Sequence, residues 1–202
     1  DQLVSNRNIH PMSDNIQVTL PVLKVTDVPL KVKFVESAGA RLENYDWSLS
    51  HSSITLSGEA AQLSSLDELV VGTLALEDLR GQESFTYDIP VPEGVNNLSG
   101  ITTVTLSITA KDVETREVEA LKFSYENFSG DHTVSILTSS LPVTLRGTAG
   151  DITAVTGDDV HVIADLSGIS ADSGSYTVPA RISVTGYDLG AVGSYEVTVH
   201  IG

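Results

Sequence analysis

The amino-acid sequence predicts an all-β fold: tandem β modules in an elongated array, each with at most a short helical turn. Many short segments alternate apolar and polar residues, which is the period of a half-buried strand. Thr, Val, Ile and Ser are abundant, Met occurs once, and no long stretch keeps apolar residues at helical spacing. An internal repeat at an offset of 87 to 93 residues runs through most of the chain.

The alternation predicts the strands in order along the chain. The limits of each expected strand are the limits of its two-residue alternation. In the closing segment, for example, Tyr195, Val197 and Val199 share one face. Strands are expected at 18–22, 28–34, 54–58, 102–108, 141–147, 176–184 and 195–201. Two short helical turns are also expected, one at 63–69 with Ser64 or Ser65 as N-cap and one at 151–157.

The repeat divides the chain into modules. Gly58 and Gly147 each close a strand, and each is followed by a segment of small residues that ends in Asp-Leu-x-Gly. The segment 18–22 resembles the closing strand of both copies. We therefore expect a module at 24–110, a second at 111–202, and residues 1–23 as the tail strand of a preceding repeat. The polar junction at 109–117 has no Pro or Gly run, which indicates a stiff linker.

The repeated Asp-Leu-x-Gly favours a structural turn over a catalytic motif. Catalysis would require a partner at fixed spacing in both copies, but the residue before the Asp is Glu in one copy and Ala in the other. Gly81 and Gly168 are expected to hold turn conformations with positive φ, and Asp78 and Asp165 to cap loop amides. Gly58 and Gly147 are interpreted as strand-end or bulge glycines.

Acidic residues near the end of the chain raise the alternative of a metal-assisted hydrolase. The candidates are Asp158, Asp159, Asp165 and Asp172. Their spacing does not match a calcium loop, and the first copy of the repeat carries an arginine where the second has an acidic loop. The five histidines do not recur at matching positions of the two modules. A solvated acidic loop is the favoured interpretation, with no metal, no cofactor and no catalytic residue expected.

Charge and cysteine content limit the partners and the location. The formal net charge is −16, which argues against nucleic acid and anionic lipid headgroups as partners. The absence of cysteine suits an extracytoplasmic protein in an oxidising setting. No apolar run reaches the length of a membrane span. Trp47, with Tyr45 nearby, is a weak candidate for recognition of a carbohydrate or a protein, although a lone Trp is more often partly buried.

Taken in order, these motifs resemble the YbbR-domain family. The resemblance rests on Val28-Pro29 at the start of a module, the strands that end at Gly58 and Gly147, the Asp-Leu-x-Gly and the closing strands. The second copy has Glu119 where the first has the proline. The resemblance implies extracytoplasmic modules anchored by an N-terminal transmembrane helix outside these residues. It also implies a CdaR-like role as regulator of a membrane-bound diadenylate cyclase, the enzyme that makes cyclic di-AMP.

The leading expectation is therefore a non-enzymatic regulatory and interaction region whose partner is that cyclase. The alternative is a cell-surface adhesin or cell-wall-binding array of β modules, in which Trp47 and Tyr45 would contact glycan. A transmembrane helix just before residue 1 and a neighbouring cyclase gene would favour regulation, whereas a sorting signal would favour adhesion.

Overall fold

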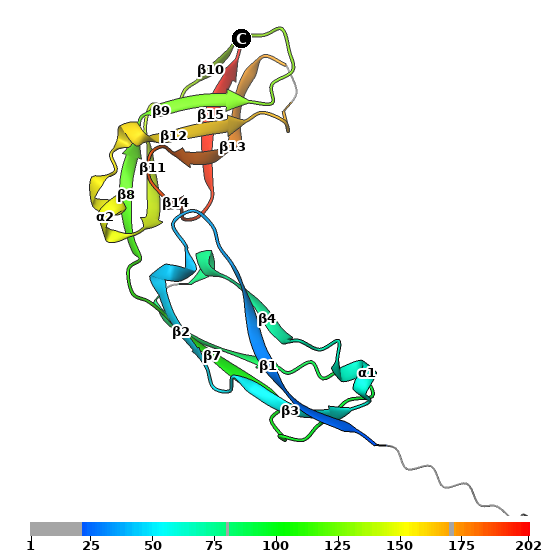
Figure 1. The fold of residues 1–202 in the computed structure, drawn as a ribbon. Coiled ribbons are helices and arrows are strands. Elements are labelled where there is room, and N and C mark those ends of the chain that lie inside the picture. The colour runs from blue at the N-terminus through cyan, green and yellow to red at the C-terminus, as the bar shows by residue number, and fades with distance from the viewer. Residues whose placement is uncertain (1–21, 80, 170–171) are drawn as a thin grey trace, which may run out of the picture.

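The computed structural model describes residues 22–79, 81–169 and 172–202, which form two β modules placed end to end along a curve (Figure 1). Each module has its own hydrophobic core, one built by residues between Val28 and Ile108 and the other by residues between Val118 and Val199. The all-β class predicted from the sequence is confirmed. Most of the predicted tail strand, residues 1–21, lies outside the described residues.

The N-terminal module, residues 24–110, contains two sheets. Its strands are β1 (Lys24–Val35), β2 (Tyr45–Leu49), β3 (Ser53–Gly58), β4 (Leu69–Ala75), β5 (Gln82–Asp88), β6 (Asn96–Asn97) and β7 (Thr103–Ala110). Its helical turns are η1 (Leu42–Asn44), α1 (Ala60–Leu63) and η2 (Leu76–Asp78). One sheet has the order β4-β1-β3-β6 and the other β2-β7-β5. Alternate side chains of β1 and β7 point inward, because the strand period places every second residue on the core face.

The C-terminal module, residues 114–202, also contains two sheets. Its strands are β8 (Glu114–Ala120), β9 (Lys122–Glu126), β10 (Val134–Ile136), β11 (Leu141–Gly147), β12 (Val160–Asp165), β13 (Gly174–Val184), β14 (Gly190–Ala191) and β15 (Tyr195–Ile201). Its helical turns are α2 (Ala149–Ala154) and η3 (Gly157–Asp159). The sheets have the orders β10-β15-β13-β12-β9 and β14-β11-β8. Val197, Val199 and Ile201 of β15 are buried, as their alternation predicts.

The two modules share a skeleton. In each, the first strand pairs antiparallel with a strand that ends in glycine, so Lys24 lies opposite Gly58 and Glu114 lies opposite Gly147. β1 then continues into a parallel pairing with β4, and β9 makes the corresponding parallel pairing with β12. One difference is that β1 is continuous, whereas its counterpart is interrupted at Leu121. The other is that β12 also pairs with β13, while no β4–β5 ladder occurs among the described residues.

The helical turns differ in position from the prediction. α1 covers residues 60–63, so Ser64 is its C-cap rather than an N-cap, and its hydroxyl donates to the Ala61 carbonyl. α2 overlaps the predicted turn but begins at residue 149, with the Thr148 hydroxyl accepting from the Asp151 amide. Single helical turns this short show no 3.6-residue period, so their limits depend on capping and on the strands beside them.

Candidate functional site at the module junction

The linker between the modules is held at each of its three residues. β7 ends at residue 110 and β8 begins at residue 114. The Lys111 amide donates to the Asn44 carbonyl at 3.0 Å, and Asp112 Oδ1 accepts from the Ala149 amide at 3.2 Å. Val113 packs against the core of the N-terminal module. A linker this short, bonded on both sides, does not act as a flexible tether.

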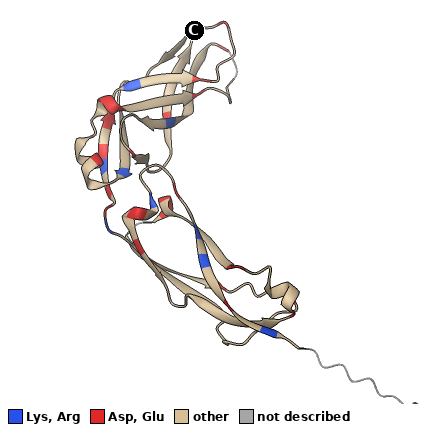
Figure 2. Ribbon diagram, in the orientation of Figure 1, with Lys and Arg blue, Asp and Glu red and all other residues tan. Residues whose placement is uncertain are grey.

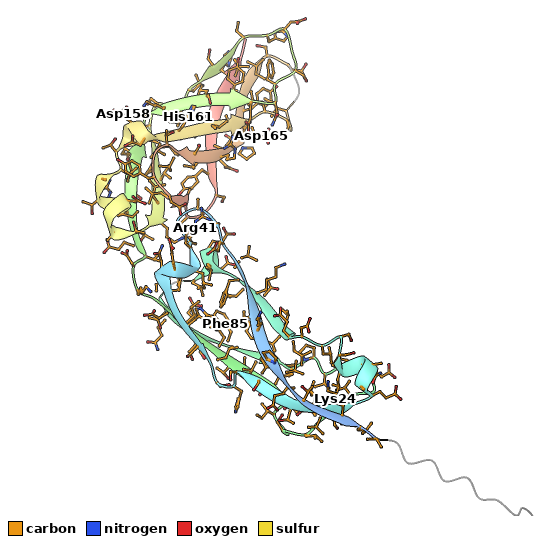
Figure 3. All side chains as sticks on the ribbon, viewed as in Figure 1. Lys24, Arg41, Phe85, Asp158, His161 and Asp165 are labelled. Atoms are coloured by element: carbon orange, nitrogen blue, oxygen red, sulfur yellow. The ribbon has the colours of Figure 1, made fainter. Side chains whose placement is uncertain are left out.

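An ion pair joins two loops that are far apart in the sequence. Arg41 Nε lies 2.7 Å from Asp188 Oδ2, and Arg41 Nη2 lies 3.1 Å from Asp188 Oδ1 (Arg41 is labelled in Figure 3). The Gly39 amide also donates to Asp188 Oδ1, at 3.3 Å. The hydrogen bonds from Arg41 lower the pKa of the Asp188 carboxyl. Both side chains are about 40% exposed, so solvent screening weakens the ion pair.

Two glycines let the backbones of the modules touch. A Cβ at Gly39 would lie 2.0 Å from the Arg146 carbonyl oxygen, and a Cβ at Gly190 would lie 2.1 Å from the Ala38 carbonyl oxygen. Gly39 also has φ +67, in the left-handed region that favours glycine. Any side chain at either position would separate the two loops. The contact therefore depends on glycine from both modules.

Arg146, near the end of β11, makes the third connection. Its side chain is buried with 5% exposure, and Nη1 donates to the backbone carbonyl of Glu77 in η2. Nε is buried and has no hydrogen-bond partner among the described residues. Next to it lies a cavity of about 430 Å³ lined from both modules. The lining residues are Glu77, Leu79, Gly81, Ala110, Val113, Thr115, Thr144, Arg146 and Val192.

The predicted skeletal residues lie in turns and at strand ends. Gly58 and Gly147 are the last residues of β3 and β11. Asp165 accepts hydrogen bonds from Asn127 Nδ2 at 2.9 Å and from the Ser167 amide at 3.0 Å. Both bonds lower the pKa of its carboxyl, and the bond from Asn127 has the larger effect. The amide-capping role predicted for this residue is therefore present. Asp78 lies in η2. Residue 80, which holds the position that Ser167 has after Asp165, lies outside the described residues.

The two motif glycines differ in conformation. Gly81 has φ +114, as predicted, but Gly168 does not have positive φ, so that prediction was wrong. After Asp165, the turn is formed by the Asp165–Ser167 bond and by the Ile169 amide donating to the Leu166 carbonyl. Such a turn does not need a left-handed residue at its third position.

Tyr45 and Trp47 have different environments although both lie in β2. Tyr45 is 4% exposed, and its hydroxyl donates to the Leu76 carbonyl at 3.3 Å. A recognition role for Tyr45 was therefore a wrong prediction, because its ring is part of the core. Trp47 is 45% exposed, with its ring centroid 5.1 Å from that of Phe34 on β1.

The C-terminal module has a groove where the N-terminal module has this aromatic pair. Trp47 lies opposite Ile108 of β7, and Val134 lies opposite Ile201 of β15, so the two residues hold corresponding positions. With valine there, a groove of about 620 Å³ opens beside β9 and β10. It is lined by Leu121, Phe123, Ser124, Tyr125, Val134, Ile136, Thr138 and Ser139.

The acidic residues suspected of binding metal do not converge. Asp158 and Asp165 lie at opposite ends of β12 (Figure 3). Asp159 accepts from the Thr156 amide and hydroxyl at 2.9 and 2.7 Å, which lowers the pKa of its carboxyl and caps η3. Within residues 22–79, 81–169 and 172–202, no three His, Cys, Asp or Glu side chains form a group that could hold a metal ion.

The junction residues were missed by the sequence analysis. Arg41, Asp188 and Arg146 belong to no repeated motif and to no recognisable spacing. Gly39 and Gly190 resemble ordinary loop glycines until the loops are placed against each other. In the part of the chain that the structure describes, no helix has the length and apolar character needed to cross a membrane.

Comparison with known proteins gives structural neighbours only, because no family model and no curated protein matches the chain. A YbbR-like protein from Streptococcus pneumoniae is 14% identical, with a TM-score of 0.31, over 93% of this chain and 98% of that one. A YbbR-like domain of a Listeria monocytogenes protein is 20% identical, with a TM-score of 0.33, over 44% of this chain and 92% of that one. A Streptococcus thermophilus protein solved in solution is 19% identical, with a TM-score of 0.36, over 47% and 92%. Two of these three carry the name of the family that the sequence resembles.

Proposed function

We propose that this chain is a non-enzymatic interaction region whose two modules act as one rigid spacer. The observation that carries the proposal is the junction, where the linker, the Arg41–Asp188 pair and the Gly39 and Gly190 contacts all restrain one module against the other. A catalytic role is not supported, because Asp159 and Asp165 cap local turns and Asp158 forms an ion pair with Lys122. Acidic side chains occur on both modules (Figure 2), which favours a protein partner over nucleic acid.

The partner that we propose is a membrane-bound diadenylate cyclase, as the sequence resemblance implies. The modules would lie on the extracytoplasmic side of the membrane, attached through a transmembrane segment outside these residues. A rigid spacer suits this role, since a partner bound to one module then fixes the position of the other relative to the membrane.

Co-expression of the cyclase with variants of the membrane-anchored protein tests this function. The variants are the intact protein, the anchor alone, a form lacking residues 22–202, and Gly190→Ala, which is expected to separate the junction. Intracellular cyclic di-AMP is the readout, with equal expression verified for each variant. The proposal expects the anchored modules to change the cyclic di-AMP level and Gly190→Ala to reduce that change. Equal levels in all four strains would exclude regulation by these modules.

The alternative function is a cell-wall-binding or adhesive array, and the observation that favours it is the half-exposed ring of Trp47. Exposed aromatic rings provide stacking surfaces for sugars. Sedimentation with purified cell walls, comparing the protein with Trp47→Ala, separates this alternative from the first. Binding that is lost in the variant would support adhesion, whereas no binding by either protein would count against it.

A further inference from the structure

We propose that the cavity at the module junction binds a small organic monocarboxylate, with Arg146 as the residue that holds the carboxylate. The cavity volume of about 430 Å³ is within the usual range of ligand pockets. Its walls include residues of η2, β7, the linker, β8, β11 and the segment after β14, so a ligand in it would contact both modules. The inference goes beyond the proposed function and does not require a cyclase partner.

Arg146 carries an unbalanced charge. Arginine stays protonated in proteins, and a buried charge is costly unless it is paired and hydrogen-bonded. Nη1 has the Glu77 carbonyl as its acceptor, but Nε is buried without one, and no ion pair of Arg146 is present among the described residues. By contrast, Arg41 and Arg181 each have an acidic partner although both are far more exposed. The chain has 27 acidic residues, yet in the part that the structure describes none of them forms an ion pair with this buried guanidinium.

The module fold does not require arginine at this position. Arg146 precedes Gly147 just as Ser57 precedes Gly58, and both residues are 5% exposed. The N-terminal module therefore fills the same place in its skeleton with a small neutral side chain. The guanidinium is thus a feature of the junction, which is where the cavity lies.

The chemistry of the cavity wall defines the class of ligand. Leu79, Ala110, Val113 and Val192 give it an apolar lining, while Thr115, Thr144 and Arg146 supply the hydrogen-bonding residues. A guanidinium matches the two oxygens of a carboxylate in a planar, bidentate geometry. A monocarboxylate with an apolar body of a few carbons fits these conditions better than phosphate does.

Binding can be tested by titrating the protein with butyrate, and in parallel with inorganic phosphate, while recording amide NMR shifts. The expected result is a saturable shift of residues that line the cavity with butyrate and a much weaker response with phosphate. Arg146→Ser, which places there the residue that the other module carries, should weaken butyrate binding at least tenfold. Arg181→Ser, which removes an exposed arginine, should bind butyrate like the unmodified protein.

A second variant keeps the test decisive if Arg146→Ser perturbs the junction. Val192→Phe leaves the guanidinium in place and fills the cavity, so it should also abolish the shifts. Absence of saturable shifts in the unmodified protein would overturn the proposal, as would equal butyrate binding by Val192→Phe. Phosphate binding as tight as butyrate binding would overturn the assignment of the ligand as a monocarboxylate.

Discussion

Replacing Gly190 by alanine should separate the two modules without unfolding either one. Gly190 does not have positive φ, so its own backbone accepts an L-residue. The new Cβ, however, would lie 2.1 Å from the Ala38 carbonyl oxygen in the other module. Restoring a 3.0 Å contact requires the loops to move apart by about 0.9 Å. The atom in the way belongs to the backbone, so no side-chain rotation can relieve the overlap.

That displacement is enough to break the neighbouring polar contacts. Asp188 lies two residues from Gly190, and adding about 0.9 Å to its 2.7 Å bond with Arg41 Nε exceeds hydrogen-bonding distance. The Gly39 amide bond to the same carboxylate, already 3.3 Å, would be lost as well. The ion pair is exposed and screened by solvent, so its loss adds little to the cost. The Gly39 bond is partly buried and its acceptor is an ionised carboxylate, and a hydrogen bond of this kind contributes about 1–2 kcal/mol. The expected loss of about 1–2 kcal/mol shifts the docked-to-undocked ratio by roughly 5- to 30-fold.

Residual dipolar couplings measure this effect directly, because they report the orientation of each module separately. In the unmodified protein, both modules should fit one alignment tensor, and in Gly190→Ala the two tensors should diverge. Gly168→Ala is the matched control, since a Cβ there meets no atom within 4 Å and φ is not positive. A single shared tensor in Gly190→Ala, with unchanged couplings, would refute the argument that backbone contact at this glycine sets the module orientation.

Three further predictions follow from single positions. Gly81→Ala should lower the free energy of unfolding by about 1 kcal/mol or more in urea titration, because alanine resists φ +114, while Gly168→Ala should change it by less than about 0.5 kcal/mol. Trp47→Val should destabilise the N-terminal module by about 1–2 kcal/mol, since it removes the ring contact with Phe34; an unchanged melting temperature would contradict this. The pKa of Asp188 is lowered by its bonds from Arg41, so its contribution to docking is complete above the ordinary aspartate pKa of about 3.9 and declines as pH falls through the lower folded value. Small-angle scattering should therefore show the junction opening in acid, and an identical acid response in Asp188→Asn would exclude this carboxyl as the cause.

The sequence was sufficient for the strands because their information is local. Every second residue of β7 and β15 faces a core, and the same two-residue period is visible in the letters. It was insufficient for Tyr45 and Trp47, which share one face of β2. Alternation predicts which residues share a face, but not which part of that face other strands cover. Other core residues cover Tyr45, whereas the ring of Trp47 is about half exposed and lies beside Phe34 of β1.

The junction was out of reach of sequence reasoning for a different reason. Arg41 and Asp188 are 147 residues apart, and neither belongs to a pattern that marks a pairing. Gly39 and Gly190 can be recognised as contact residues only once the two modules are placed together, because each glycine leaves room for a backbone carbonyl oxygen of the other module. The positive φ of Gly39 is the one local signal, and it is equally compatible with an ordinary turn.

The skeleton shared by the modules explains how such a junction can arise without a change of fold. Ser57 and Arg146 occupy corresponding buried positions before the strand-ending glycines, and within residues 22–79, 81–169 and 172–202 it is Arg146 that bonds to the other module. The corresponding end of the N-terminal module, marked by Lys24 in Figure 3, points away from the junction. A serine is too short to bond to a neighbouring module, whereas an arginine extends across the boundary to the Glu77 carbonyl. Substitutions at module ends can therefore set the contacts between modules while the cores remain unchanged, which is why the repeat is visible in the strands and absent at the junction.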